Sequence, residues 1–392
     1  KAGTEYFVNF NVTTVEKEPL IPIGHEIACD QFRLPIESPK KAFKTSGPKL
    51  TVSTNGDNLS ASSSKVNFIF NKKTGIVTSY KVDGTEYFSE GFGIQPNFWR
   101  APTDNDYGNG MPKRLQVWKE SSKNFNVTDA TVTMDGNNAV VNVNYLLPAG
   151  NLYIVNYTIY PSGAVNVAAR FTSTDMDAAQ TEVSESTRTA TFTPGRDAAR
   201  KEASKLNVPR IGVRFRLPAS MNQVEYFGRG PAENYLDRNA GSMVGLYKST
   251  AEELYFPYVR PQENGHHTDT RWVSLSTGKK GLLIQADNTI GFNALRNSIE
   301  DFDDEEATGL SRQWSNFTPE QVANHDEAAA KNVLRRQHHI NDITPRDFVE
   351  VCVDLKQQGV AGYDSWGSRP EPAYTLPANR EYNWGFTLIP LK

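Results

Sequence analysis

Apolar and polar residues alternate along much of this chain. The alternation is clearest in five segments, which are residues 141–145, 153–159, 165–171, 349–355 and 382–388. Successive side chains of a β-strand point to opposite faces of a sheet, so a period of two predicts half-buried strands. We therefore expect these five segments to be strands with one face in a hydrophobic core.

Short turn sequences separate neighbouring strand patterns. The tripeptide Pro-Ser-Gly at 161–163 lies between two of the alternating segments, and residues 72–75 separate the apolar runs at 68–70 and 76–77. Glycine, proline and polar residues in such positions are typical of hairpin turns. Because few helical patterns lie between the strands, we expect an all-β fold, a large antiparallel β-sandwich, and not a parallel α/β layout.

One segment carries the start signals of a helix. Thr318 can cap a helix, Pro319 suits its first position, and Gln321 follows the cap by three residues. These signals predict a helix over residues 322–336.

An acidic run precedes that helix. Residues 300–306 hold six carboxylates in seven positions. Like charges this dense repel one another, so the run is expected to be a solvated loop. A calcium loop is the alternative, although the run lacks the Asp-x-Asp-x-Asp-Gly spacing that directs ligands inward.

Residues 34–50 have the composition of a linker. They contain three prolines, one glycine and four lysines without a sustained apolar period. We therefore divide the chain into a short β piece over residues 1–35, a linker over 36–50 and one large β domain over 51–392. The alternation of Tyr6, Val8, Phe10 and Val12 suggests that the chain begins inside a fold.

Size, charge and cysteine content exclude several classes of protein. At 392 residues the chain exceeds the roughly 250 to 300 residues at which single cores stop growing. Its net charge is −3, from 42 basic and 45 acidic residues, so no global field favours nucleic acid or a membrane surface. No segment approaches the ~20 apolar residues of a membrane helix. Cys29 and Cys352 are the only cysteines, and we expect two unpaired thiols that belong to no metal motif.

Four blocks of unusual sequence follow one another along the chain. They are Arg-Ala-Pro-Thr-Asp-Asn-Asp within residues 97–110, Gly-Arg-Gly-Pro within 226–238, Pro-Gln-Glu-Asn-Gly within 258–265 and Asp-Ser-Trp-Gly within 363–367. In composition and order these blocks resemble the C-terminal portion of family 2 β-galactosidases, which is sometimes encoded separately as a small subunit. The likeness extends over essentially the whole chain.

The resemblance implies a fold and a reaction. Residues 1–35 would be the C-terminal strands of an immunoglobulin-like domain, and residues 51–392 a broad β-sandwich like that of galactose mutarotase. The parent enzyme would hydrolyse terminal β-D-galactosides with retention of configuration, through two glutamates of a barrel that lies upstream of residue 1. We therefore expect no catalytic residue in this chain.

The resemblance also implies partners. We expect the chain to pack on the catalytic barrel of the same enzyme, to contact a galactoside substrate and to help build a homo-oligomer. The family often uses Mg and Na in the barrel, whereas no cofactor or metal is expected in this chain. An export signal would lie at the start of the parent chain, so a bacterial-type protein of this kind could be cytoplasmic or periplasmic.

Trp366 is the foremost candidate binding residue, together with Asp364. Both lie in residues 359–372, a segment rich in glycine and proline that is expected to form a shaped loop. An indole can stack on the apolar face of a sugar ring. By resemblance, Trp366 would form one wall of the galactoside pocket. The alternative is a tryptophan buried for packing.

A second candidate cluster has hydroxyl-binding and cation-binding potential. Its members are Asp104, Asn105, Asp106 and Gly108. By resemblance, residues 108–113 would form a loop that borders the active-site cleft and packs on the barrel. The alternative is turn capping and ion pairing with Arg100 or Arg114.

An alternative sugar site can be drawn elsewhere. It comprises Glu263, His266, His267 and Arg271. A histidine beside a carboxylate can act as a general acid or base, and mutarotases use such a pair. This site would make the chain an autonomous carbohydrate-binding module or an aldose-1-epimerase-like domain. Successive strand residues face opposite ways, however, so His266 and His267 could not both line one cleft.

Charged residues of the second block have a structural interpretation. Arg229, Glu233, Asp237 and Arg238 are expected to form ion pairs and hydrogen bonds that stabilise the fold.

Overall fold

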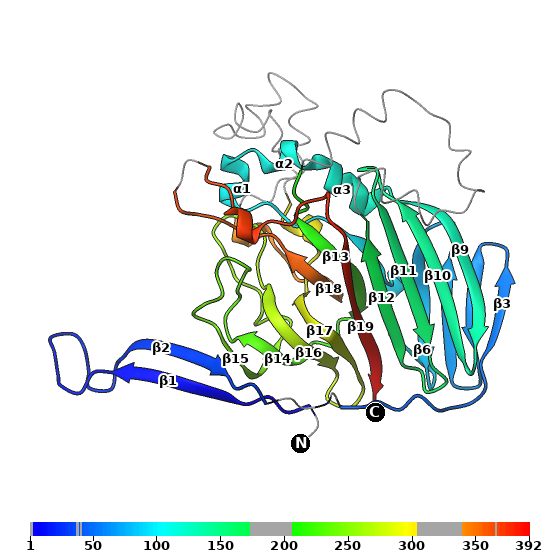
Figure 1. Ribbon diagram of the computed structural model, residues 1–392, viewed down its shortest axis with the longest axis horizontal. Coiled ribbons are helices and arrows are strands. Elements are labelled where there is room, and N and C mark those ends of the chain that lie inside the picture. The colour runs from blue at the N-terminus through cyan, green and yellow to red at the C-terminus, as the bar shows by residue number, and fades with distance from the viewer. Residues whose placement is uncertain (1–2, 37–38, 40, 173–205, 304–338, 365–366) are drawn as a thin grey trace.

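The computed structural model describes residues 3–36, 39, 41–172, 206–303, 339–364 and 367–392. Most regular elements in these ranges are β-strands, and every strand pairing is antiparallel. The expected all-β class is therefore confirmed. The strands form a two-stranded, a five-stranded and a twelve-stranded sheet (Figure 1).

The five-stranded sheet is a meander in which each strand pairs with the next along the chain. Its strands are β3 (Thr51–Asn55), β4 (Asn58–Ser62), β5 (Val66–Asn71), β6 (Ile76–Val82) and β7 (Thr85–Glu86). The predicted turn at residues 72–75 joins β5 to β6.

The twelve-stranded sheet has a main path and a branch. The main path runs β15-β14-β16-β17-β19-β12-β11-β10-β9. Its strands are β9 (Asn126–Asp135), β10 (Asn138–Leu146), β11 (Leu152–Ile159), β12 (Val165–Phe171), β14 (Gln223–Gly230), β15 (Met243–Thr250), β16 (His267–Ser276), β17 (Gly281–Leu295) and β19 (Tyr382–Leu391). The branch contains β8 (Gln95–Asn97), β13 (Arg210–Pro218) and β18 (Phe348–Gln357).

The sheet branches at β17 because this long strand pairs with different neighbours at its two ends. Residues 281–286 pair with β19, whereas residues 291–295 pair with β18. Between the two, residues 287–289 are exposed. The branch carries β13 and β18 into the interior, where charged side chains are enclosed.

The core lies between the five-stranded sheet and the large sheet. Phe68 of β5 packs on Tyr157 of β11 with ring centroids 5.6 Å apart, and both side chains are fully buried. The hydroxyl of Tyr145 donates to the Gly75 carbonyl oxygen at 2.9 Å. The two faces therefore form the sandwich that the alternation predicted.

The five predicted strands are present as β10, β11, β12, β18 and β19. In β10, β11 and β12 buried and partly exposed residues alternate, as a half-buried strand requires. The prediction of a half-buried strand is wrong for β18, which is buried on both faces over Val349–Asp354. The second face carries Glu350 and Asp354, which are buried in ion pairs with arginines of β13.

Helical structure is limited in the part of the chain that is described. Three short helices, α1 (Asp104–Gly108), α2 (Met111–Arg114) and α3 (Gln116–Lys123), connect β8 to β9. The 3₁₀ turns are η1 (Ser89–Gly91), η3 (Ile299–Asp301), η4 (Ile340–Asp342) and η5 (Pro372–Tyr374). The helix expected over residues 322–336 lies outside the described residues. No described helix is long and apolar enough to cross a membrane.

The start of the acidic run is not a solvated loop, so that expectation is wrong for residues 300–303. Asp301 is buried and accepts hydrogen bonds from Arg346 and from the Ser298 main chain. Asp303 is buried and accepts a hydrogen bond from Trp99 Nε1 at 2.8 Å. The carboxylates avoid repulsion because each has its own donors. The rest of the run lies outside the described residues.

The N-terminal residues form a separate two-stranded hairpin of β1 (Phe7–Thr13) and β2 (Glu26–Arg33). Figure 1 shows this hairpin extending from one side of the large sheet. Val8, Phe10 and Phe32 lie on one face of it and are exposed. Residues 34–36, 39 and 41–50 contain no strand. The division into three parts, and the immunoglobulin-like origin of the first, stay predictions.

The two cysteines are unpaired, as expected. Cys29 is exposed on the hairpin, whereas Cys352 is buried in β18.

Candidate functional site

The four unusual sequence blocks meet at one end of the large sheet, beside α1 (Figure 1). Arg100 of the first block contacts residues 357–359, which lead into the fourth, and Asp237 of the second block contacts residues 360 and 361. Asp104 of the first block contacts Gln262 of the third. Segments far apart in the sequence therefore form one structural unit.

The centre of this unit is a buried ion pair between Arg100 and Asp106. Arg100 Nη2 donates to both carboxylate oxygens of Asp106, at 3.0 and 2.9 Å, and both side chains are almost completely buried. Asp106 also accepts a hydrogen bond from the main chain of Thr103, whose hydroxyl caps α1. Burial raises the pKa of Asp106, while the Arg100 charge and the Thr103 hydrogen bonds oppose that rise. Asp106 therefore has the role that the alternative interpretation of the cluster predicts, which is turn capping and ion pairing with Arg100.

The other residues of the 104–108 cluster face different ways. Asp104 is exposed and pairs with Arg260 at 3.4 Å, and Arg260 stacks on the ring of Tyr107. Asn105 lies against Gly362, where an added Cβ would be 2.8 Å from Nδ2 of Asn105. The cluster does not converge on one ligand, and its place beside a cleft stays a prediction.

The segment that leads into the fourth block is held from two sides. The Arg100 guanidinium donates to the main-chain carbonyls of Gln358 and Gly359 at 3.3 and 3.2 Å. The Asp237 carboxylate accepts from the main-chain N–H groups of Val360 and Ala361 at 2.9 and 2.8 Å. Four consecutive residues thus have a main-chain group fixed by a charged side chain.

Asp364 is exposed, and its carboxylate accepts a hydrogen bond from the Ser368 main chain at 3.3 Å. Trp366 lies outside the described residues, so its role stays a prediction. The neighbouring Gly367 packs on the main chain of Gly108. The two candidate segments of the sequence, 104–108 and 363–367, are therefore in contact.

The charged residues of the second block have structural partners. Glu233 accepts hydrogen bonds from Tyr258, from Arg238 at 2.8 Å and from the Gly265 main chain at 2.7 Å. Arg229 instead pairs with Asp269 at 2.6 Å. The structural interpretation therefore holds for each residue, although the four do not form one network.

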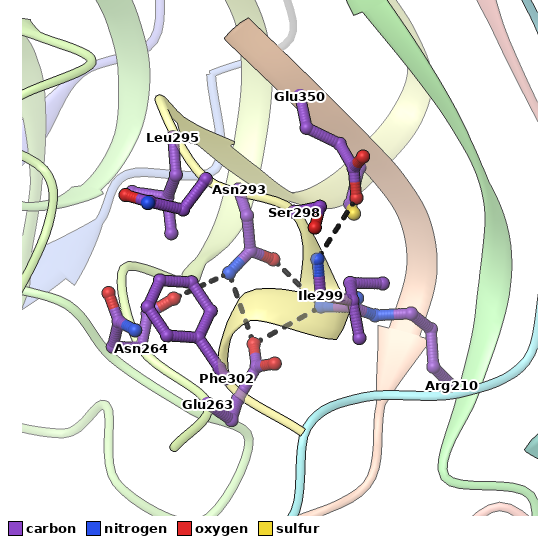
Figure 2. Close-up of a pocket in the computed structure, with 11 residues that line it drawn as sticks. Arg210, Glu263, Asn264, Asn293, Leu295, Ser298, Ile299, Phe302 and Glu350 are labelled. Carbon is purple, nitrogen blue, oxygen red and sulfur yellow. Dashed lines mark hydrogen bonds and ion pairs between the residues drawn. The ribbon is translucent and has the colours of Figure 1, made fainter. Parts of the chain in front are cut away.

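Glu263, the centre of the alternative sugar site, is buried in a set of hydrogen bonds (Figure 2). It accepts from Arg210 at 3.2 Å, from Asn293 at 3.1 Å and from Gln357 at 3.0 Å. The cavity beside it has a volume of about 20 Å³. This is room for a water molecule and not for a sugar.

The two histidines of the alternative site contact different neighbours. His266 stacks on Tyr235 and its Nδ1 is 2.9 Å from Asn293 Oδ1, whereas His267 stacks on Phe292. Burial lowers the pKa of His266 well below its usual value and that of His267 to about 4. Both imidazoles are therefore neutral near pH 7.

Arg271 is not near this site. It pairs with Glu5 at 2.8 Å and so attaches the N-terminal segment to β16. Asn293 contacts both Glu263 and His266, so these two residues lie close together. Arg271 instead pairs with Glu5.

Sequence reasoning missed the buried charges of β13 and β18. Arg210 lies between Glu263 and Asp354, with a nitrogen 3.2 Å from an oxygen of each. Burial raises the pKa of Asp354 to about 7, and Arg210 opposes this rise. Arg214 and Arg216 both pair with Glu350. Among the described residues, no group of three or more histidine, cysteine or acidic side chains is placed to hold a metal ion.

Comparisons with known proteins agree on a family. Residues 62–388 match the family described as "Beta galactosidase small chain". The β-galactosidase of Priestia megaterium is 32% identical over 371 residues, which cover 94% of this chain and 30% of that protein. A β-galactosidase small subunit of Latilactobacillus sakei is 27% identical over 332 residues, which cover 82% of this chain and 92% of that subunit. The chain thus spans about 30% of the length of the first of these relatives.

Two solved structures overlap with this chain at low sequence identity and low TM-score. The galactose 1-epimerase of Lactobacillus acidophilus NCFM overlaps with a TM-score of 0.42 and 8% identity, over 88% of this chain and 98% of that one. A galactose mutarotase-like protein of Lactobacillus casei overlaps with a TM-score of 0.40 and 10% identity, over 85% of this chain and all of that one.

Proposed function

Since the chain belongs to the β-galactosidase small-chain family, we propose that it is the non-barrel part of an enzyme that hydrolyses terminal β-D-galactosides with retention of configuration. Its task in that enzyme is to complete the substrate pocket and to provide surface for the oligomer. The catalytic part of the same enzyme is its partner.

The convergence of the four sequence blocks carries this proposal. The blocks that resemble the β-galactosidases most are scattered over about 270 residues of sequence, from 97 to 367, yet they contact one another, or the residues just before the fourth block, beside α1. A purely structural role would not require the distinctive residues to gather at one end of the sheet. The segment held there, 358–368, is the one that contains Asp364 and Trp366.

The chemistry of the carboxylates supports a non-catalytic role. Retaining hydrolysis needs two carboxyl groups about 5 to 5.5 Å apart that are free to attack and to transfer a proton. Here Asp106 is bound by Arg100, Asp237 by two main-chain N–H groups and Glu263 by Arg210. Each is engaged in holding the fold. The reacting carboxyl groups would belong to the catalytic part.

Trp366 would provide the sugar-facing surface of this chain. A tryptophan ring offers a flat apolar area for the C–H face of galactose, and the neighbouring Asp364 is exposed to accept hydrogen bonds from hydroxyl groups. Such a residue contributes binding and orientation and takes no part in proton transfer. Its loss would weaken substrate binding without removing the reaction.

Activity measurements on the isolated chain and on the parent enzyme test the proposal. The purified chain should not hydrolyse a chromogenic β-galactoside above background, and it should not bind galactose or lactose in calorimetric titration. In the parent enzyme, Trp366→Ala should raise KM by about five- to tenfold, as expected for the loss of an aromatic stacking contact of about 1–1.5 kcal/mol, whereas Trp366→Phe should retain part of the binding. Unchanged galactoside kinetics in Trp366→Ala would contradict the pocket role.

The same experiments separate the alternative functions. Binding of galactose by the isolated chain would indicate an autonomous carbohydrate-binding module. Acceleration of galactose mutarotation in polarimetry, lost in Glu263→Gln, would indicate an aldose-1-epimerase. The epimerase has less support, because Glu263 is held by Arg210, Asn293 and Gln357 beside a cavity of about 20 Å³.

A further inference from the structure

The buried side chain of Arg100 makes more hydrogen bonds than the neutralisation of its charge requires. Asp106 alone would neutralise it, and buried ion pairs add little net stability compared with apolar side chains of the same size. Arg100 nevertheless also donates to three acceptors on another segment, Gln357 Oε1 at 3.3 Å and the carbonyls of Gln358 and Gly359. The acceptor residues are 257 to 259 positions away from Arg100 in the sequence. The guanidinium therefore joins two segments that no β-ladder connects.

Asp237 fixes the same segment with a negative charge, whereas Arg100 does so with a positive one. Its two carboxylate oxygens accept from the successive N–H groups of Val360 and Ala361. A side chain at position 359 would displace this carboxylate, because a Cβ added at Gly359 would lie 2.3 Å from Asp237 Oδ2. The carbonyls of 358 and 359 are thus held by a cation, and the N–H groups of 360 and 361 by an anion.

The chain turns sharply directly after these contacts. Ala361 has a φ of 55°, which is unfavourable for a residue with a Cβ, and Gly362 has a φ of 107°. A strained residue persists only where its surroundings determine its conformation. The hydrogen bond from the Ala361 N–H to Asp237 is such a constraint. The direction in which the chain leaves toward Asp364 is therefore set at Ala361.

The return of the chain is held as well. Gly367 packs on the Gly108 main chain, and Asn109 Nδ2 donates to the Ser368 carbonyl at 3.4 Å. Both contacts come from the end of α1, the helix that Arg100 fixes through Asp106. Residues 358–361 and residues 367–368 are thus held by the same small group of residues.

We propose that Arg100 and Asp237 are positioning residues of the galactoside pocket: together they fix the main chain at 358–361 and thereby the direction in which the chain runs on to Asp364. The inference rests on the proposed function for its effect on substrate. Its structural part, the fixing of the segment, is independent of it. Neither residue touches the sugar, and both act through the main chain.

Hydrogen exchange of the chain itself tests the structural part. The variants are Arg100→Lys, which keeps the charge but loses the planar fork, and Asp237→Asn, which keeps the shape but has one acceptor oxygen in place of two. Amides of residues 358–368 should exchange about tenfold faster in both, as expected for the loss of a charged hydrogen bond. Arg229→Lys is the matched control, because Arg229 also bonds a carboxylate and two carbonyls, but away from this segment. Unchanged exchange at 358–368 in the two variants would overturn the proposal.

Kinetics of the parent enzyme test the effect on substrate. We expect Arg100→Lys and Asp237→Asn to raise KM for a β-galactoside about tenfold while kcat changes less than about threefold, and Arg229→Lys to change neither. Faster exchange with unchanged KM would uphold the positioning of the segment and overturn the role proposed for Trp366. If Arg100→Lys does not fold, Asp237→Asn decides the question, since Asp237 is only partly buried.

Discussion

The main chains of Gly108 and Gly367 lie in direct contact, and a Cβ added at Gly367 would come within 2.7 Å of the Gly108 carbonyl oxygen. The two residues are 259 positions apart and belong to the first and the last of the distinctive sequence blocks. A Cβ added at Gly108 would lie 3.3 Å from the Gly367 Cα, so the approach is tighter on the side of Gly367. The contact joins the end of α1 to the turn that contains Asp364.

This contact predicts a penalty for a side chain at position 367. Gly367 has a φ of 99°, so Gly367→Ala should suffer backbone strain in addition to the clash with Gly108. We expect the free energy of unfolding to fall by about 2–4 kcal/mol. Gly84→Ala is the control, because Gly84 has a φ of 77° and no atom within 4 Å of its added Cβ. It should lose only about 1–2 kcal/mol in urea unfolding. Equal losses in the two variants would show that the contact is not tight.

The interface of the two sheets predicts a second pair of variants. Phe68 is fully buried against Tyr157 and Tyr80, whereas Phe10 on the hairpin is 54% exposed. Phe68→Ala should lower the free energy of unfolding by about 3–5 kcal/mol because it leaves a cavity. The same substitution at Phe10 should cost less than about 1 kcal/mol. Chemical denaturation followed by tryptophan fluorescence measures both, and similar costs would contradict the packing of the sandwich.

Much of this sandwich could be predicted from the alternation of residues. The segments of β10, β11 and β12 face the core with every second side chain, and that pattern is local. The branch of the sheet at β17 could not be predicted in this way. Its two ends pair with different strands, and nothing in the sequence of a single strand specifies its neighbours.

The buried charges show a second limit of sequence reasoning. In β18 the alternation predicts that the polar positions Glu350 and Asp354 face solvent, yet both are buried. Their partners are arginines of β13 that are spaced by two or four residues: Arg214 and Arg216 pair with Glu350, and Arg210 pairs with Asp354. Opposite charges with the same period on two strands are the signal that could have indicated a buried pair of strands.

The sequence indicates which residues belong to the candidate site, but it does not show which of them contact one another. The distinctive blocks stand out in the sequence, and ion pairing of the 104–108 cluster with Arg100 or Arg114 is one of its interpretations, which Asp106 fulfils with Arg100. The contacts of Asp237 with residues 360 and 361 depend on the fold of the whole sheet. They become visible only when distant segments are placed side by side.

The pairing of Arg271 with Glu5 predicts how the hairpin is attached. Both side chains are mostly buried, at 17% and 18% exposure, and the pair joins the N-terminal segment to β16. Arg271→Ala should increase local opening of the N-terminal segment about fivefold, as expected for about 1 kcal/mol. Limited proteolysis should then cut before residue 50 faster, with an unchanged melting temperature for the rest. Arg170→Ala, which removes a pair with Glu381 on the large sheet, is the control. Equal cleavage rates in the two variants would contradict the attachment.

The burial of His267 predicts a loss of stability in mild acid. Its pKa is lowered to about 4 in the fold by burial, against about 6.5 in an unfolded chain. Between these values the unfolded state binds more protons than the folded state, so the free energy of unfolding falls as the pH decreases from 6.5 to 4. Above pH 6.5 the imidazole is neutral in both states and has no such effect.

His267→Gln should remove this part of the pH dependence. The difference in unfolding free energy between the original chain and the variant should shrink by up to about 3 kcal/mol as the pH is lowered from 6.5 to 4. His266, which is also buried with a lowered pKa, contributes in the same direction and remains in both proteins. His25→Gln, at an exposed position, is the control for the substitution itself. Urea unfolding at half-unit pH intervals measures the difference, and a constant difference over this range would show that His267 is protonated to the same extent in both states.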